Sequence, residues 1–193
     1  MYKVLAVSHR RLCADFLAQT EKLAQGGIPL ILREKDLPEE EYIQLAAQVW
    51  EIYQRYGAVC ITHFYPEAAR RLGAKALHLP LWKLEENPAL AQEFAVGVST
   101  HSVEQAQKAE ALGARYITIG HIFETNCKKD LPPRGLSLLS EVCQAVQIPV
   151  YAIGGISPAN ANLALEAGAD GVCMMSALMQ AADPAAFLAQ CDV

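Results

Sequence analysis

The stretch Leu112-Gly113-Ala114-Arg115-Tyr116-Ile117-Thr118-Ile119-Gly120-His121 contains the pattern that decides the fold. A helix-forming segment ends at Gly113, the residue type that best tolerates a left-handed C-terminal turn. An apolar run of strand length follows at once and ends at a glycine and a histidine. The same turn from helix to strand occurs again at Leu72–Ala76 and Ala167–Gly171. The sequence therefore predicts alternating helices and strands with short connections.

Eight short apolar runs divide the chain, and each is continuous rather than alternating, which is typical of strands buried on both faces of a parallel sheet. The runs are Val4–Ser8, Ile28–Arg33, Ala58–His63, Ala76–Leu79, Phe94–Ser99, Tyr116–Ile122, Val150–Gly154 and Gly171–Ser176. Eight strands with intervening helices predict a compact α/β fold, a (β/α)8 TIM barrel that forms a single domain over residues 1–193. An open doubly wound sheet is the alternative, and the count of eight makes it the poorer fit.

Helix-start signals support this division. Leu37–Ile43 predicts a long helix with a proline in its first turn and acids at its positive end. Thr100–Ser102 offers a hydroxyl N-cap to the helix after the fifth strand, and Ser157–Asn160 does the same after the seventh. The weakest predicted helix, about 85–92, is interrupted by Asn87-Pro88.

Composition excludes several classes of protein. The chain has 193 residues and is 52% apolar, yet no apolar run approaches the ~18 residues of a membrane span. The N-terminus lacks a secretory leader, so we expect a cytoplasmic protein without a membrane partner. A net charge of −5 argues against a nucleic-acid partner. Six cysteines without a CxxC pair suggest reduced thiols, and homo-oligomerisation stays open.

The predicted barrel also indicates where an active site would lie, because active sites in this fold lie at the carboxyl ends of the strands and in the loops that follow. Polar residues at those ends are Arg33, Glu34, Lys35, His63, His78, Ser99, His101, His121, Thr125, Lys128, Gly154, Gly155 and Ser176.

A phosphate site is predicted where the last two strands end. Gly154 and Gly155 leave backbone N–H groups uncovered at the start of a helix, and Ser176-Ala177 closes the eighth strand with small residues. The loops after strands seven and eight are the usual phosphate site of TIM barrels.

His121 is the candidate general acid/base, because an imidazole can move protons near neutral pH. Lys128 is expected to face an anionic ligand. Arg33 either binds a substrate carboxylate or pairs structurally with Glu34 or another acid. Lys35 leaves the same strand.

The other histidines are secondary candidates. His63 and His101 are second-tier site residues, and His78 is more typical of a hydrogen-bonded core histidine. Zinc binding by three histidines is disfavoured, because no local ligand spacing supports it.

Five segments together resemble the thiamine phosphate synthase superfamily: Leu32–Lys35, Gly97–Ser102, Gly120–Lys129, Ala152–Ile156 and Ala169–Val172. The resemblance covers nearly the whole chain and implies a TIM barrel.

Two departures from the synthase pattern point to one branch. The synthase holds Mg²⁺ and a pyrophosphate through an Asn-Asp pair after the third strand and a Gly-Gln-x-Asp motif after the fourth. This chain has His63-Phe64 and Pro80-Leu81-Trp82-Lys83 there, so both metal carboxylates are replaced, by Phe64 and Lys83. His121 stands where the synthase has proline, and Gly120–Lys129 with Arg134–Ser140 closely resembles the TenI branch.

The TenI resemblance implies an isomerase, a thiazole tautomerase of thiamine biosynthesis, which aromatises a thiazole carboxylate phosphate without metal or cofactor through this histidine. The expected substrate-binding residues are Arg33, Lys35, His63, Ser99, Thr125, Cys127 and Lys128, and the expected phosphate-binding residues are Gly154, Gly155, Ser176 and Ala177. Cys127, which replaces a threonine of the synthase, is interpreted as lining the pocket. The alternatives are a catalytically silent binder or regulator of thiamine intermediates and a residual thiamine phosphate synthase.

Overall fold

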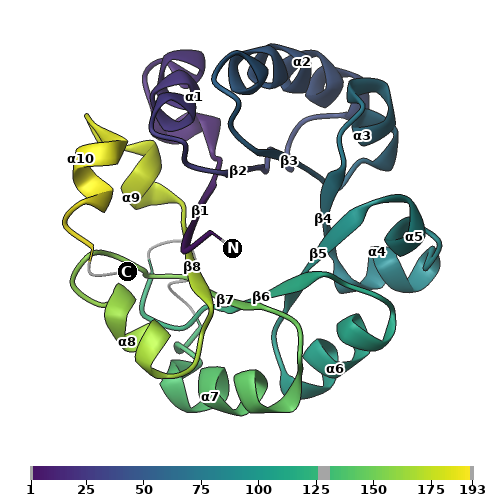
Figure 1. Cartoon of the computed structure of the whole chain (residues 1–193), viewed down its shortest axis with the longest axis vertical. Helices are drawn as coiled ribbons and strands as arrows, with labels where there is room; N and C mark the ends of the chain where they lie inside the picture. Colours follow the sequence, from purple (N-terminus) through teal and green to yellow (C-terminus); the bar gives the residue numbers. More distant parts are fainter. Residues whose placement is uncertain (1, 126–130, 192–193) are drawn as a thin grey trace.

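The computed structural model describes residues 2–125 and 131–191, and within these ranges parallel strands close into a barrel (Figure 1). The strands are β1 (Val4–Val7), β2 (Leu30–Leu32), β3 (Cys60–His63), β4 (Ala76–Pro80), β5 (Ala95–Thr100), β6 (Tyr116–Gly120), β7 (Val150–Ile153) and β8 (Gly171–Met174). Each pairs with the next along the chain, and Val4 of β1 pairs with Val172 of β8 to close the ring. The predicted (β/α)8 barrel is confirmed, and the open sheet is excluded.

Helices surround the barrel on its outside (Figure 1). They are α1 (Phe16–Gln25), α2 (Glu39–Arg55), α3 (Pro66–Leu72), α4 (Leu81–Glu86), α5 (Leu90–Glu93), α6 (Val103–Ala111), α7 (Gly135–Ala145), α8 (Ala161–Glu166), α9 (Ser176–Met179) and α10 (Pro184–Leu188), with a 3₁₀ turn at Arg10–Leu12. The predicted helix at 85–92 is two short helices, α4 and α5. Pro88 lies between them, where it cannot donate a backbone hydrogen bond.

The helix caps agree with the sequence in one place and differ in another. Ser102 caps α6, because its side chain accepts a hydrogen bond from Gln105 N. The expected hydroxyl cap at Ser157 is wrong, since α8 begins only at Ala161. Asn160 instead stabilises the turn before α8: its Oδ1 accepts from Ser157 N at 2.8 Å, and its Nδ2 donates to Gly155 O at 2.9 Å.

Two apolar cores hold the fold together. The larger core fills the layer between the strands and the helices, with fully buried residues such as Leu30, Val98 and Leu139. The smaller core fills the inside of the barrel; its buried members are Leu5, Val7, Ile31, Ile61, Tyr151 and Cys173. Because side chains alternate across a strand, residues two apart from these positions also point into the barrel. This alternation carries polar side chains from several strands to its carboxyl end.

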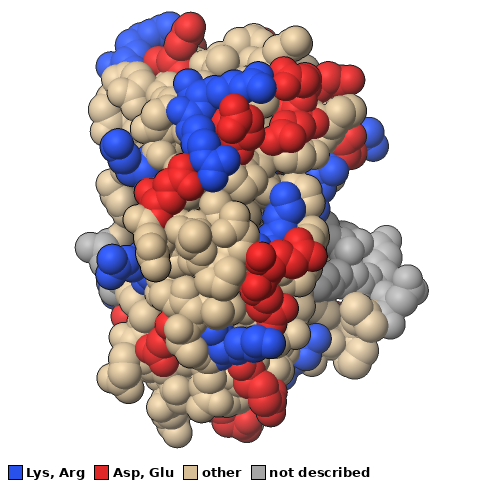
Figure 2. Space-filling model, turned by 90° about the vertical axis from the view of Figure 1, so that its right-hand side faces the viewer, with Lys and Arg blue, Asp and Glu red and all other residues tan. Residues whose placement is uncertain are grey.

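The outer surface mixes charges of both signs. On the side that carries α3, α4 and α5, basic and acidic side chains alternate without a large patch of either sign (Figure 2). Arg70 of α3 pairs with Glu93 of α5, and Glu85 of α4 pairs with Lys108 of the neighbouring α6. Among the described residues, no helix combines the length and apolar character that crossing a membrane requires.

Candidate active site at the carboxyl end of the barrel

A cavity of about 510 Å³ opens where the strands end. Its described lining comes from β1, β2, β5, β6, β7 and β8 and the residues that follow them: Val7, His9, Arg33, Lys35, Ser99, Thr100, His101, Thr118, Gly120, His121, Thr125, Ile153, Gly154, Gly155, Ile156, Cys173, Met174, Met175 and Ser176. The ends of β3 and β4 do not contribute to this described lining. The cavity is therefore displaced toward one side of the barrel mouth.

Most of the residues expected from the sequence meet in this cavity. His121, Arg33, Lys35, Ser99, Thr125, Gly154, Gly155 and Ser176 line it, as does His101. His63 and Ala177 do not belong to the lining, and Cys127 and Lys128 lie outside the described residues.

Hydrogen bonds of the backbone and of the ring hold His121 at the end of β6. The carbonyl of His121 accepts a hydrogen bond from Arg134 N at 2.9 Å, and Nε2 lies 3.2 Å from the carbonyl oxygen of Leu131. A carbonyl can only accept, so this contact places the proton of a neutral imidazole on Nε2. The opposite nitrogen, Nδ1, is then a basic lone pair. It is buried and has no hydrogen-bond partner among the described residues.

The glycine pair after β7 permits a close approach to His121. Gly154 has a φ of +98°, and a side-chain carbon there would lie 2.3 Å from His121 Cβ. At Gly155, with a φ of +70°, it would lie 2.3 Å from the carbonyl oxygen of Glu124. The two glycines therefore pack the β7 loop against the β6 loop as well as lining the cavity. A helix does not follow them directly, because α8 begins at Ala161, which corrects the expected helix N-terminus at this site.

A helix begins directly after β8, whereas the sequence predicted one directly after β7. Strand β8 ends at Met174, and the short helix α9 starts at Ser176, which lines the cavity. Ser176, which has a small side chain, therefore lines the same cavity as Gly154 and Gly155. Ala177 lies within α9 and outside the lining.

The buried carboxylate of Glu34 anchors the segment that carries Arg33 and Lys35. Glu34 is 2% exposed and accepts hydrogen bonds from Ser8 Oγ at 2.7 Å and from Arg10 N and Nη1 at 3.0 Å each. Ser8 Oγ also accepts from Arg33 N at 2.7 Å. Among the described residues, Glu34 thus pairs with Arg10 and not with Arg33, whereas a pair of Arg33 with another acid stays a prediction.

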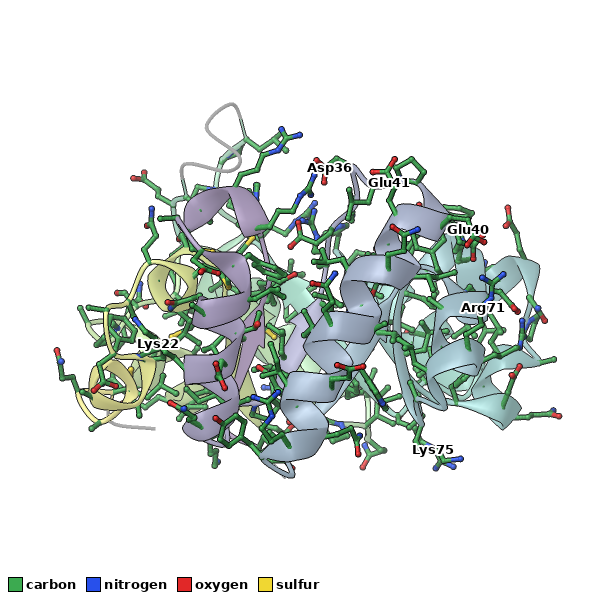
Figure 3. The ribbon with its side chains drawn as sticks, turned by 90° about the horizontal axis from the view of Figure 1, so that it is seen from above. Lys22, Asp36, Glu40, Glu41, Arg71 and Lys75 are labelled. Carbon is green, nitrogen blue, oxygen red and sulfur yellow. The ribbon has the colours of Figure 1, made fainter. Side chains whose placement is uncertain are left out.

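Arg10 extends this network to the rim of the barrel. Its guanidinium also binds Asp36 in a two-pronged contact, and this contact holds the pKa of Asp36 at about 2, below the ordinary 3.8. Asp36, Glu40 and Glu41 lie at the end of the barrel where α2 begins, whereas Lys75 lies at the opposite end (Figure 3).

Two histidines lie inside the barrel below the cavity. The rings of His63 and His78 stack with centroids 6.0 Å apart, and each side chain is 3% exposed. Burial lowers the pKa of His78 to about 3 and lowers the pKa of His63 well below its usual value. His78 contacts Tyr116 Oη and Ser99 Oγ, which confirms the prediction of a hydrogen-bonded core histidine.

His9 is a cavity residue that the sequence interpretation missed. It follows β1, lines the cavity, and has a buried Nδ1 without a hydrogen-bond partner among the described residues. Alternation along β1 carried the signal, because Leu5 and Val7 point into the barrel and His9 is the next residue in that series.

The ends of β3 and β4 present an aromatic cluster with one cation. Lys83 Nζ lies 3.8 Å from the centroid of the Phe64 ring and donates to the Phe64 carbonyl oxygen at 2.9 Å. Trp82 packs against Phe64 from the side. An ammonium beside apolar rings offers no oxygen ligand to a hard divalent ion, so these residues do not fit the Mg²⁺ that the synthase resemblance implies. Within residues 2–125 and 131–191, no group of three or more His, Cys, Asp or Glu side chains is arranged to hold a metal.

The closed barrel with a polar cavity at its carboxyl end places the chain among the TIM-barrel proteins. A family model described as thiamine monophosphate synthase matches residues 4–178. A thiamine-phosphate synthase of Bacillus velezensis is 39% identical over 181 residues, which cover 90% of this chain and 81% of that protein. One of Clostridium acetobutylicum is 32% identical over 188 residues, which cover 93% and 88%. The chain belongs to the thiamine monophosphate synthase family.

A solved relative supports the same assignment. The thiamine phosphate pyrophosphorylase of Pyrococcus furiosus superposes with a TM-score of 0.82 at 28% identity, covering 97% of this chain and 92% of that one. The superfamily resemblance seen in the sequence is thereby confirmed.

Proposed function

We propose that this member of the family is a thiazole tautomerase, an isomerase that aromatises a thiazole carboxylate phosphate by proton transfer. The observation that carries the proposal is the His121 imidazole in the cavity wall, with Nε2 directed at the Leu131 carbonyl and a buried Nδ1 that has no hydrogen-bond partner among the described residues. The TenI resemblance of Gly120–Lys129 supports the same assignment.

The chemistry needs one mobile proton. The His121 imidazole takes a proton from the ring carbon of the thiazole, and the electrons of that C–H bond become a ring double bond. The electrons of the exocyclic double bond then take the proton back from the imidazole at the exocyclic carbon. The aromatic product supplies the driving force, so a well-placed imidazole suffices. In this proposal, no metal or cofactor takes part in either step.

The other cavity residues anchor the substrate. The backbone at Gly154, Gly155 and Ser176 binds the phosphate, and the cations of Arg33 and Lys35 bind the carboxylate. Three further predicted contacts, Thr125, Cys127 and Lys128, belong to the same loop as His121.

Thiamine phosphate synthesis is the second candidate, because the relatives from Bacillus velezensis and Clostridium acetobutylicum are named thiamine-phosphate synthases. The residues at the ends of β3 and β4 count against it. Phe64 and Lys83 replace the carboxylates that the synthase pattern requires. Their side chains contact each other, and neither belongs to the described lining of the cavity.

One pair of assays distinguishes the candidates. The non-aromatic thiazole carboxylate phosphate is supplied without metal, and formation of the aromatic product is followed by absorbance. In parallel, thiamine phosphate formation is measured with Mg²⁺ present. Turnover in the first assay alone supports the tautomerase, turnover in the second alone supports the synthase, and ligand binding without turnover in either supports a silent binder or regulator.

His121→Asn tests the role of the imidazole. We expect the variant to fold and to bind the aromatic thiazole phosphate with unchanged affinity, while kcat falls by about 10²- to 10⁴-fold because the proton acceptor is lost. The matched control is His101→Asn, which changes a cavity histidine whose Nδ1 already contacts the Gly120 carbonyl at 2.8 Å. An unchanged kcat in His121→Asn would remove this residue from the mechanism.

A further inference from the structure

A row of hydrogen-bonding side chains runs from inside the barrel to the cavity wall. Tyr116 Oη lies 3.0 Å from His78 Nδ1, and Ser99 Oγ lies 2.8 Å from His78 Nε2. Thr118 Oγ1 lies 3.5 Å from Ser99 Oγ. Tyr116 and His78 lie below the cavity, whereas Ser99 and Thr118 line it. The row therefore connects a half-buried tyrosine to the ligand space through one imidazole.

The fold makes specific room for this row. Tyr116 is the first residue of β6, and its ring crosses the neighbouring strand β5 at Gly97. A side-chain carbon at Gly97 would lie 2.0 Å from the ring carbon Cζ of Tyr116. Glycine at this position is thus what lets the phenol reach His78. The row therefore depends on the absence of a side chain at Gly97, in the middle of β5.

The protonation states of the row are fixed by burial. Desolvation raises the pKa of Tyr116 well above its usual value, so the phenol keeps its proton. The pKa of His78 is lowered to about 3, so its imidazole is neutral at neutral pH and carries a single N–H. The single hydrogen of the neutral imidazole can lie on either Nδ1 or Nε2.

The hydrogen-bond partners of His78 determine which of its nitrogens is protonated. Among the described residues, His78 Nδ1 is the one acceptor in contact with the Tyr116 hydroxyl. A proton on Nδ1 would leave the phenol proton of this half-buried side chain without an acceptor among the described residues, which is an unfavourable arrangement. The phenol therefore donates to Nδ1, and the imidazole hydrogen lies on Nε2.

We propose that Tyr116 and His78 are positioning residues that turn the Ser99 hydroxyl into a hydrogen-bond donor aimed at the ligand. His78 Nε2 donates to Ser99 Oγ at 2.8 Å, so Ser99 accepts a hydrogen bond from the imidazole and does not give its own proton to it. The Ser99 proton is then left to point into the cavity. It binds an anionic oxygen of the substrate, a carboxylate or a phosphate, beside the cations of Arg33 and Lys35. This role rests on the proposed function for the identity of the ligand.

Nitrogen-15 NMR of the histidine side chains tests the polarity of the row directly. In the wild-type protein at neutral pH, we expect His78 with Nδ1 unprotonated and Nε2 protonated. The opposite tautomer would overturn the proposal, because Ser99 would then spend its proton on His78. This measurement is independent of any activity, so it decides the polarity even if the protein does not bind a thiazole phosphate and the proposed function fails.

A double-mutant cycle tests the effect on binding, with the aromatic thiazole carboxylate phosphate as the probe. Ser99→Ala and Tyr116→Phe should each raise Kd by roughly three- to tenfold, the range for one lost hydrogen bond. In the Ser99→Ala background, Tyr116→Phe should have no further effect, because its influence passes through Ser99. Independent, multiplicative effects of the two substitutions would contradict the proposal.

Tyr151→Phe is the matched control. Tyr151 lies in the same barrel interior, edge-on to Tyr116, but its hydroxyl donates to the Tyr2 carbonyl oxygen at 2.9 Å. Its removal should leave both the His78 tautomer and the Kd unchanged. A loss of affinity equal to that of Tyr116→Phe would instead indicate a general packing effect and would overturn the specific role of the row.

Discussion

Single buried side chains set the geometry of the cavity, and Glu34 shows this most directly. Its carboxylate joins Ser8 and Arg10 of the β1 end to the segment of Arg33 and Lys35. A buried carboxylate with three donors is costly to alter, because its partners lose their acceptor when it is changed. The two cations at the cavity therefore depend on a residue that does not line it.

Substitution of Glu34 tests this anchoring. We expect Glu34→Gln to lower the free energy of unfolding by about 2–4 kcal/mol, since the amide keeps one acceptor oxygen but loses the charge that pairs with Arg10. The control is Glu21→Gln, which changes an exposed pair with Arg55 and should cost less than about 1 kcal/mol. Urea unfolding measures both, and equal costs would contradict the anchoring role.

The sequence predicted much of the site at this scale. His121, Arg33 and Ser99 follow apolar runs, and barrel geometry brings the ends of such runs together whatever their distance along the chain. The pairing of Glu34 with Arg10 was not predictable, because it depends on which side chain of neighbouring strands turns inward. His9 was missed because β1 was treated as a continuous apolar run rather than as an alternating one.

At the scale of elements, the β6 and β7 loops behave as one packed unit. Ile122 N donates to Ile153 O and Phe123 N to Gly154 O, both at 3.0 Å. The absence of a side chain at Gly154 brings the backbone of the β7 loop against His121. The sequence interpretation attributed these glycines to anion binding. The structure adds a packing requirement that only the contact between two distant loops reveals.

Gly154→Ala separates the packing requirement from simple backbone strain. Gly57 is the matched control, because it also has a positive φ, +62°, but nothing lies within 4 Å of the added carbon. We expect Gly57→Ala to cost about 1–2 kcal/mol of unfolding free energy from the left-handed backbone alone. Gly154→Ala should cost about 1–3 kcal/mol more because it overpacks the contact with His121. Thermal or urea unfolding compares them, and equal costs would show that the loops can separate freely.

For the whole molecule, the prediction of eight strands rested on patterns that are local in the sequence. Turn glycines such as Gly113, with a φ of +89°, and continuous apolar runs were enough to place every strand within a few residues. Closure of the ring was inferred from the count, and the β1–β8 pairing confirms it. The late start of α8 was not predictable, since a Ser-Pro segment is equally suited to a turn.

The buried histidines predict how stability depends on pH. An unfolded histidine takes up a proton near pH 6.5, whereas folded His78 does so only near pH 3. The unfolded state therefore binds more protons between these values, and the free energy of unfolding should decrease as the pH falls from about 6.5 towards 3. His78→Gln should flatten this slope when denaturant midpoints are measured across the range.

Asp36 provides an internal control for that measurement. Its folded pKa is lower than its unfolded one, so the stabilisation it provides is present above about pH 4 and is lost as the pH falls towards about 2. Asp36→Asn should leave the slope between pH 6.5 and 4 unchanged and alter it only below. A wild-type stability that stays constant from pH 6.5 to 4 would contradict the buried neutral histidines.

The pairing of β1 with β8 also has a consequence for synthesis on the ribosome. The cavity wall combines His9, which follows the first strand, with Ser176, which follows the last. A nascent chain can form its early helix–strand units as they emerge, but it cannot enclose the ligand space until the eighth strand has been made. Such distant pairings are slow to form. A chain can therefore bind the ligand only after its eighth strand has paired with its first, and a ligand can stabilise only chains that have already closed the ring.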